Sequence, residues 1–310
     1  MLAAMNSWMR TWLALAWLGV AVFEAGAAED WTARYGAYGR LVVTQMVSAP
    51  FPHPQRAAGH RYKDEFFSAE QSYSDGTVAV FVPKGFRAGP RVDCVLHFHG
   101  WRGRVPEVLS RYQLIEQFAA SGRNAVLVVP QGPRGAADSF GGKLEDPGGF
   151  RRFMDELFQV LRTDPRLAGA APEAGRLVLS AHSGGGRVVA EILAVGGMAE
   201  KVNDVWLFDA LYSRAEKYRA WQQRSGGRWL TVYTDRGGTT NETARILGEL
   251  RRDGVPLAAV EENGAGPEVL RRRQPIFVHT DLGHDDVLHR RQTFRVFLET
   301  SGLEPLEIGR

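Results

Sequence analysis

Apolar and polar residues follow two patterns from about residue 75 to the C-terminus. Short apolar runs rich in β-branched side chains predict strands over residues 78–83, 92–97, 125–130, 177–181, 205–208, 229–233 and 276–279. Between these runs, apolar residues recur three and four positions apart, as they do along one face of a helix. This spacing predicts helices over residues 149–162, 188–194, 213–223, 241–252 and 286–300.

Strands that alternate with helices along a chain predict βαβ units. We therefore expect an α/β fold with a mainly parallel central sheet and helices on both faces. Ligand sites in such sheets lie at the carboxyl ends of the strands. The side chains that directly follow the predicted strands are accordingly the candidates for chemistry.

The first thirty residues follow a different pattern. Arg10 precedes an apolar run over residues 12–23, and the small residues Ala25-Gly26-Ala27-Ala28 come next. A positive start, a short apolar core and an Ala-x-Ala site predict a secretory signal peptide over residues 1–28. The run is about twelve residues long, whereas a membrane-spanning helix needs about 20. We expect export to the periplasm or the medium, with no stable membrane insertion after cleavage; an uncleaved anchor is the alternative.

The rest of the chain divides into an N-terminal segment and one catalytic domain. Residues 29–75 contain Pro50, Pro52 and Pro54, which exclude long helices, so we expect an irregular segment that packs on the domain. Residues 76–310 hold all the predicted strands and helices. This length is ordinary for a single α/β domain.

Composition and charge narrow the class of protein. The chain has 310 residues, of which 44% are hydrophobic and 24% charged, as in a soluble globular protein. Its net charge of +3 is small and spread along the chain, which argues against a nucleic-acid partner. Cys94 is the only cysteine, so no intramolecular disulfide can form. The oligomeric state stays open.

The central motif lies where the predicted strand 177–181 meets the next helix. Ser183 stands in this turn between small residues, with Ala181 and Gly185 two positions away on either side. A nucleophile on a sharp strand-to-helix turn needs such small neighbours, and the helix N-terminus favours developing negative charge. A phosphate-binding loop is the alternative interpretation, but no Gly-Lys-Ser/Thr follows.

This turn resembles the nucleophile elbow of the α/β-hydrolase superfamily, and the resemblance covers roughly residues 75–300. Ala181 stands in place of the first glycine of the family's Gly-x-Ser-x-Gly pattern. The resemblance implies a Ser–acid–His triad in that chain order and an oxyanion hole of two backbone amides. Gly184 matches the first amide. His97-Phe98-His99-Gly100-Trp101 resembles the family's His-Gly turn, which gives Trp101 as the second amide.

The general base is expected near the C-terminus, after the last strand. His284 ends a loop there and precedes a predicted helix, so it is the candidate base. His279 lies inside the strand and is expected to be a core or supporting histidine, whereas His289 is expected on a helix surface. Asp285 and Asp286 are expected to cap that helix.

Two aspartates compete for the role of the triad acid. Asp209 directly follows an apolar strand, where a carboxylate is costly to bury unless it has a partner. Asp235 follows the next strand, in the position from which most of the superfamily takes its acid, but in a turn-like stretch where aspartate is common for local reasons. We favour Asp209 and keep Asp235 as the alternative. Turn capping and surface charge are open for both.

The same segments suggest substrate contacts. Trp101 and His99 adjoin the expected oxyanion hole and are the candidates, although Trp101 also suits plain packing. His97-x-His99 is a two-ligand metal spacing, but no third ligand of a known zinc pattern lies nearby, so we expect no metal. Only a few residues separate Asp209 from the next helix, which leaves no room for a large cap domain. The site is expected to be open to a small-molecule or polymeric acyl substrate.

The sequence therefore predicts an exported serine hydrolase that cleaves a carboxylic ester through a Ser–His–Asp triad and an acyl-enzyme, without a cofactor. An exported peptidase or amidase with the same triad is one alternative. A non-catalytic binding protein that retains the fold is the other.

Overall fold

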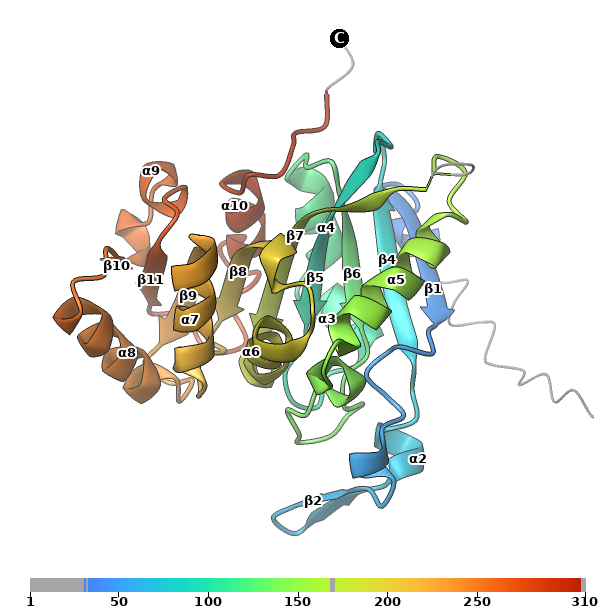
Figure 1. Cartoon of the computed structure of the whole chain (residues 1–310), viewed down its shortest axis with the longest axis horizontal. Coiled ribbons are helices and arrows are strands. Elements are labelled where there is room, and N and C mark those ends of the chain that lie inside the picture. Colours follow the sequence, from blue (N-terminus) through green and yellow to red (C-terminus); the bar gives the residue numbers. More distant parts are fainter. Residues whose placement is uncertain (1–30, 32, 168–170, 308–310) are drawn as a thin grey trace, which may run out of the picture.

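The computed structural model describes residues 31, 33–167 and 171–307. A nine-stranded sheet runs through this part of the chain in the order β1-β4-β6-β5-β7-β8-β9-β11-β10 (Figure 1). Its strands are β1 (Gly39–Gln45), β4 (Thr77–Pro83), β5 (Arg91–Phe98), β6 (Ala125–Pro130), β7 (Glu173–His182), β8 (Val202–Phe208), β9 (Arg228–Thr234), β10 (Ala258–Glu261) and β11 (Pro275–Thr280). The helices that cover it are α3 (Val105–Arg111), α4 (Leu114–Ala120), α5 (Gly149–Leu161), α6 (Gly186–Val195), α7 (Ala215–Ser225), α8 (Thr240–Arg252), α9 (Pro267–Leu270) and α10 (Thr293–Glu299).

In the order of the sheet, the seven strands β6-β5-β7-β8-β9-β11-β10 are all parallel. Near the other edge, β4 pairs antiparallel with both β6 and β1, so β4 alone runs in the opposite direction. All seven predicted strands are present. The prediction of an α/β fold with a mainly parallel sheet is therefore confirmed.

Two apolar cores lie on the two faces of this sheet. Along β6, Val126 and Val128 point into one core, and Leu127 and Val129 point into the other. Helices α5, α6, α7 and α8 close the first core, and α3, α4 and α10 close the second (Figure 1). Strands buried on both faces are almost wholly apolar, which is why the sequence identified them.

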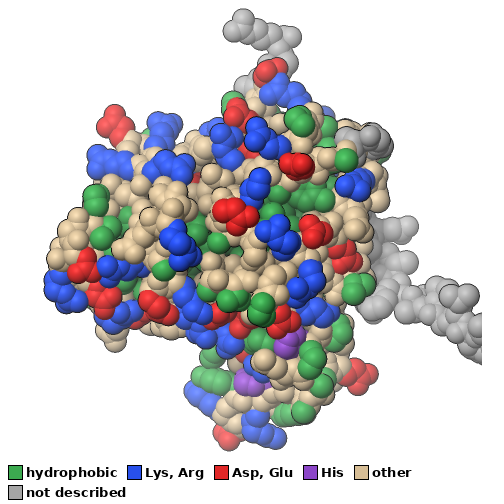
Figure 2. Space-filling view, in the orientation of Figure 1, with side chains coloured by type: hydrophobic (Ala, Val, Ile, Leu, Met, Phe, Trp, Pro, Cys, Tyr) green, Lys and Arg blue, Asp and Glu red, His purple; other side chains and the backbone are tan. Residues whose placement is uncertain are grey.

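The prediction of an irregular segment over residues 31–75 is wrong in two places. Strand β1 pairs with β4 along its whole length. Farther on, β2 (His60–Tyr62) and β3 (Glu65–Phe67) form a small hairpin, followed by the short helix α2 (Ala69–Ser72). The hairpin projects from the body of the molecule (Figures 1 and 2). An edge strand and a short exposed hairpin have little hydrophobic pattern. The prediction of an irregular segment therefore rested on Pro50, Pro52 and Pro54.

The predicted helix over residues 286–300 is wrong in its first half. Residues 284–291 form turns, and α10 begins only after Gln292, which has a left-handed φ of +55°. Val287 and Leu288 are buried in the core, so the segment shows helix-like apolar spacing without being a helix. Asp285 caps nothing and pairs with Arg111 at 2.9 Å. Helices α3 and α4 and strand β10 were not predicted.

Strand β8 ends at Phe208 and α7 begins at Ala215, so no cap domain is inserted between them. Cys94 is fully buried in β5. Among the described residues, no helix is both long and apolar enough to cross a membrane. The predicted signal peptide over residues 1–28 lies outside the described residues.

Candidate active site

Ser183 stands at the junction of β7 and α6, in a single 3-10 turn over Ser183–Gly185. Its φ of +54° is left-handed, a strained conformation for a residue with a side chain, and such strain collects at functional sites. The turn after β5 packs directly against it. A Cβ atom added to Gly100 would lie 2.5 Å from the Ser183 Cβ, so only glycine fits there.

His284 and Asp209 meet beside this turn. The Nδ1 atom of His284 lies 2.6 Å from Oδ2 of Asp209. Asp209 directly follows β8 and is 0% exposed. His284 lies in the loop after β11 and lines the same cavity as Ser183. The pairing leaves Nε2 as the free nitrogen of His284.

The Asp209 carboxylate is held from several sides. Thr234 donates to Oδ2 at 3.0 Å, and Thr239 donates a short hydrogen bond to Oδ1. Burial alone would raise the pKa of Asp209, but the hydrogen bonds from His284, Thr239 and Thr234 outweigh it and the pKa is lowered. The buried aspartate is therefore a stable anion.

Asp235 lies elsewhere. Its side chain is 70% exposed, and its Oδ1 is 3.1 Å from Nε2 of His279 on β11. His279 also contacts Glu261 at 2.8 Å, so it bridges two surface carboxylates instead of serving the core or the site. The structure brings His284 together with Asp209 and not with Asp235.

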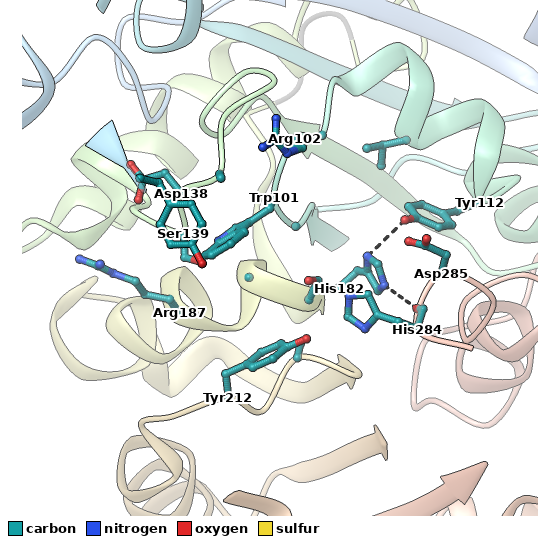
Figure 3. Close-up of a pocket in the computed structure, with 18 of the residues that line it drawn as sticks. Trp101, Arg102, Tyr112, Asp138, Ser139, His182, Arg187, Tyr212, His284 and Asp285 are labelled. Atoms are coloured by element: carbon teal, nitrogen blue, oxygen red, sulfur yellow. Dashed lines mark hydrogen bonds between the residues drawn. The ribbon is translucent and has the colours of Figure 1, made fainter. Parts of the chain in front are cut away.

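Trp101 lies across the cavity from His284, in the turn after β5. Its backbone N–H donates to no other described residue. Its indole Nε1 donates to Ser139 Oγ at 2.7 Å, and Tyr62 of the hairpin packs edge-on against the ring at 4.8 Å. Trp101 is 43% exposed and lines the cavity (Figure 3). Gly184 also lines it.

His99 does not contact the cavity, so the prediction that it binds substrate is not supported by its position. The backbone N–H of Gly132 donates to its Nε2 at 2.9 Å, which places the proton on Nδ1, and Nδ1 donates to Gly100 O at 2.7 Å. Burial lowers its pKa, against a smaller opposing effect of the Gly100 bond. This neutral ring ties the turn after β5 to the turn after β6.

The two-ligand spacing of His97 and His99 does not form a metal centre in this structure. The ring of His97 is fully buried, and its Nδ1 lies 2.9 Å from Ser180 Oγ. Within the described residues, no three His, Cys, Asp or Glu side chains are grouped as ligands for a metal ion.

The cavity around Ser183 measures about 720 Å³. The turn after β5, the start of α3, the β2–β3 hairpin and the loop after β8 line it. Figure 3 shows Trp101 and Ser139 on one side, and His182 and His284 on the other. The cavity is open to solvent.

Sequence reasoning missed Tyr212, whose ring lies edge-on to the imidazole ring of His284 with 6.4 Å between the ring centroids. Its hydroxyl donates a short hydrogen bond to Gly237 O. Burial and the nearby charge of Asp209 raise the pKa of Tyr212 to about 12, and the neighbouring Ser183 side chain acts in the other direction. Its position four residues after a strand was the only available signal.

Comparison with known proteins tests the fold. No family model matches the chain, and no curated protein sequence matches it. Among solved structures, the feruloyl esterase module of Clostridium thermocellum superimposes with a TM-score of 0.53 at 11% identity, over 87% of this chain and 89% of that one. A structure designated FAE superimposes with a TM-score of 0.52 at 10% identity, over 88% and 91% of the two chains. At such low identity the likeness concerns the fold alone: the chain has the α/β-hydrolase fold.

Proposed function

We propose that this protein is an exported serine hydrolase that cleaves a carboxylic ester, with Ser183 as nucleophile, His284 as base and Asp209 as acid. The 2.6 Å contact between His284 Nδ1 and the buried carboxylate of Asp209 carries the proposal. It orients one nitrogen of a histidine that lines the same cavity as a serine in a strained turn. A binding protein has no need of this arrangement.

The reaction runs in two halves. Ser183 Oγ attacks the ester carbonyl carbon while His284 Nε2 takes the hydroxyl proton, and Asp209 stabilises the imidazolium that forms. The backbone amides of Gly184 and Trp101 hold the oxyanion of the tetrahedral intermediate, and each such donor is worth about 3 kcal/mol in comparable enzymes. The C–O bond then breaks, the departing alcohol takes the proton from His284, and a water molecule repeats the sequence on the acyl-enzyme. These steps need no metal or organic cofactor.

Two observations favour an ester over an amide. An ester is the less demanding substrate, because an alkoxide leaves more readily than an amine. The feruloyl esterase module that shares the fold is itself an esterase by name. A peptidase or amidase with the same residues is the competing function.

Export is the second part of the proposal, and it rests on the sequence pattern of residues 1–28. An uncapped cavity of about 720 Å³ on an exported protein suits a polymeric or surface-bound acyl substrate. N-terminal sequencing of the mature protein tests export. A start at residue 28 or 29 supports it, and an intact N-terminus in the cytoplasm contradicts it.

A fluorophosphonate probe tests the enzyme directly. We expect the purified protein to be labelled once, and Ser183→Ala to abolish labelling. Ser213→Ala is the matched control, because Ser213 lines the same cavity and should leave labelling unchanged. A folded wild type that stays unlabelled contradicts the enzyme and favours a binding protein. Parallel panels of nitrophenyl esters and peptides then separate an esterase from a peptidase or amidase.

A further inference from the structure

A second histidine, His182, lies between the proposed nucleophile and base and has no part in the proton transfers. It is the last residue of β7 and is only 3% exposed. Its Nε2 lies 2.9 Å from the backbone carbonyl of His284, and the two imidazole rings pack at 4.7 Å between centroids. Figure 3 shows this bond and the contact of its other nitrogen with Tyr112.

The partners of His182 define its protonation. A carbonyl oxygen can only accept, so Nε2 carries the proton and donates to His284 O. The other nitrogen, Nδ1, lies 3.3 Å from the hydroxyl of Tyr112, which therefore donates to it. Burial, together with the nearby charge of His284, lowers the pKa of His182 to about 4. The ring is neutral at physiological pH, with one tautomer selected.

The backbone of His284 needs such support. It lies in the turns over residues 284–291, where no helix or strand ladder fixes the chain. Asp209 binds the imidazole ring and fixes its orientation, but it does not hold the backbone that carries the ring. His182 holds that backbone directly and is covalently adjacent to Ser183. One side chain thus sets the distance between two loops that come from different strands.

The far end of this connection is also held. Gln117 on α4 donates from its side-chain amide to the carbonyl of Tyr112 at 2.7 Å and to the carbonyl of Leu288 at 3.2 Å. The Tyr112 ring packs against the ring of His182 at 5.1 Å. Both the tyrosine and the loop of the base are therefore tied to the same buried glutamine.

We infer that His182 is a positioning residue that holds the His284 loop in place beside Ser183 through its hydrogen bond to the His284 carbonyl. The inference rests on the proposed function. A displacement of about 1 Å between reacting groups can lower the rate by about 10²-fold, so the loss of this single hydrogen bond can have a large effect on the rate.

The test compares His182→Phe, which keeps a flat ring without a donor, with His182→Gln, whose side-chain N–H can reach the position of Nε2. We expect His182→Phe to lower kcat and the rate of fluorophosphonate labelling by about 10²-fold, with KM changed little. We expect His182→Gln to recover most of that loss at an unchanged Tm. Tyr112→Phe removes only the hydrogen bond to Nδ1 of His182, which selects the tautomer, and should lower kcat by about fivefold.

Different outcomes separate the two proposals. Labelling of His182→Phe at the wild-type rate overturns the inference, as does an equal loss in folded Phe and Gln variants. If His182→Phe fails to fold, the Gln and Tyr112→Phe variants decide by the same criteria. If the wild type itself is never labelled, the proposed function fails. The ¹⁵N NMR signals of His182 in the wild type still test the inferred bond, because any tautomer other than Nε2–H contradicts it.

Discussion

The Nδ1 atom of His284 lies 2.6 Å from Oδ2 of Asp209, although 75 positions separate the two residues in the chain. Each follows a strand of the parallel sheet, Asp209 after β8 and His284 after β11, so the carboxyl edge of the sheet brings them together. Strand β9 lies between β8 and β11 in the sheet, and the Asp235 that follows it points away to His279. The proposed acid thus follows β8, the earlier of the two strands that carry a candidate aspartate.

The pair Asp209→Asn and Asp235→Asn tests this assignment with the same chemical change at two sites. Asp209→Asn removes the anion that stabilises the His284 imidazolium and orients its ring, and we expect kcat for a nitrophenyl ester to fall by about 10³- to 10⁴-fold. Asp235→Asn should stay within about twofold of the wild type, because only His279 at the surface loses a partner. Equal losses in the two variants contradict the assignment.

Gly237 offers a second way to disturb the acid without changing its chemistry. A Cβ atom at this position would lie 1.4 Å from Oδ2 of Asp209, so Gly237→Ala must displace either the loop or the carboxylate. We expect an activity loss of about 10²-fold, since a misplacement near 1 Å is enough for that.

Gly248→Ala is its matched control. Gly248 lies within α8 and has no atom within 4 Å of an added Cβ, so alanine there should stabilise the helix by about 1 kcal/mol and leave kcat unchanged. Activities measured on folded samples of both variants check the prediction. A fully active Gly237→Ala would show that the position of the carboxylate does not matter.

The central sheet could be predicted because buried parallel strands are marked in the sequence itself. Strands such as β6 carry apolar residues on both faces, and each ends at a turn with glycine or a polar residue. Ser183 was identified as the candidate nucleophile for the same reason, since its small neighbours Ala181 and Gly185 mark the local turn. Constraints that act between neighbouring residues, such as the burial of a strand or the tightness of a turn, leave patterns that can be recognised in the sequence.

Relations that depend on packing between distant segments left no such pattern. The apolar strand before Asp209 favoured it over Asp235, but neither its contact with His284 nor the place of Tyr212 in the cavity follows from residue type or spacing. His99 looked like a substrate contact because it adjoins Gly100, but its ring turns inward to the Gly132 amide. The segment before α10 has the apolar spacing of a helix because Val287 and Leu288 are both buried in the core.

Trp101 has two proposed roles: its backbone N–H holds the oxyanion, and its indole forms part of the cavity wall. Trp101→Phe keeps the backbone N–H proposed for the oxyanion but removes the 2.7 Å bond from the indole to Ser139 and part of the cavity wall. We expect KM to rise about fivefold, as for the loss of one hydrogen bond, and kcat to stay within about threefold. Tyr38→Phe, a change at an exposed aromatic outside the cavity, is the control. A fall in kcat with KM unchanged contradicts this division, because it would place the indole in the transition state.

The lowered pKa of His182 gives the fold a specific sensitivity to acid. Histidine in the unfolded chain titrates near 6.5, whereas burial holds His182 neutral down to about pH 4. Between these values the unfolded state binds a proton that the folded state does not, so the free energy of unfolding falls as the pH falls from 6.5 to 4. From pH 7 to pH 5 this one residue should cost about 2 kcal/mol.

His182→Gln removes that titration while keeping a donor for the His284 carbonyl. Urea unfolding of both proteins at pH 7 and pH 5 is the measurement, and the drop in the free energy of unfolding should be about 2 kcal/mol smaller in the variant. His99, whose pKa is also lowered by burial, contributes equally to both proteins and cancels in the comparison. The pKa of His97 is lowered chiefly by burial, which the variant keeps, and in smaller part by His182. The same drop in wild type and variant would mean that His182 takes up its proton in the folded state, and the single tautomer required by its bonds to His284 and Tyr112 would then be wrong.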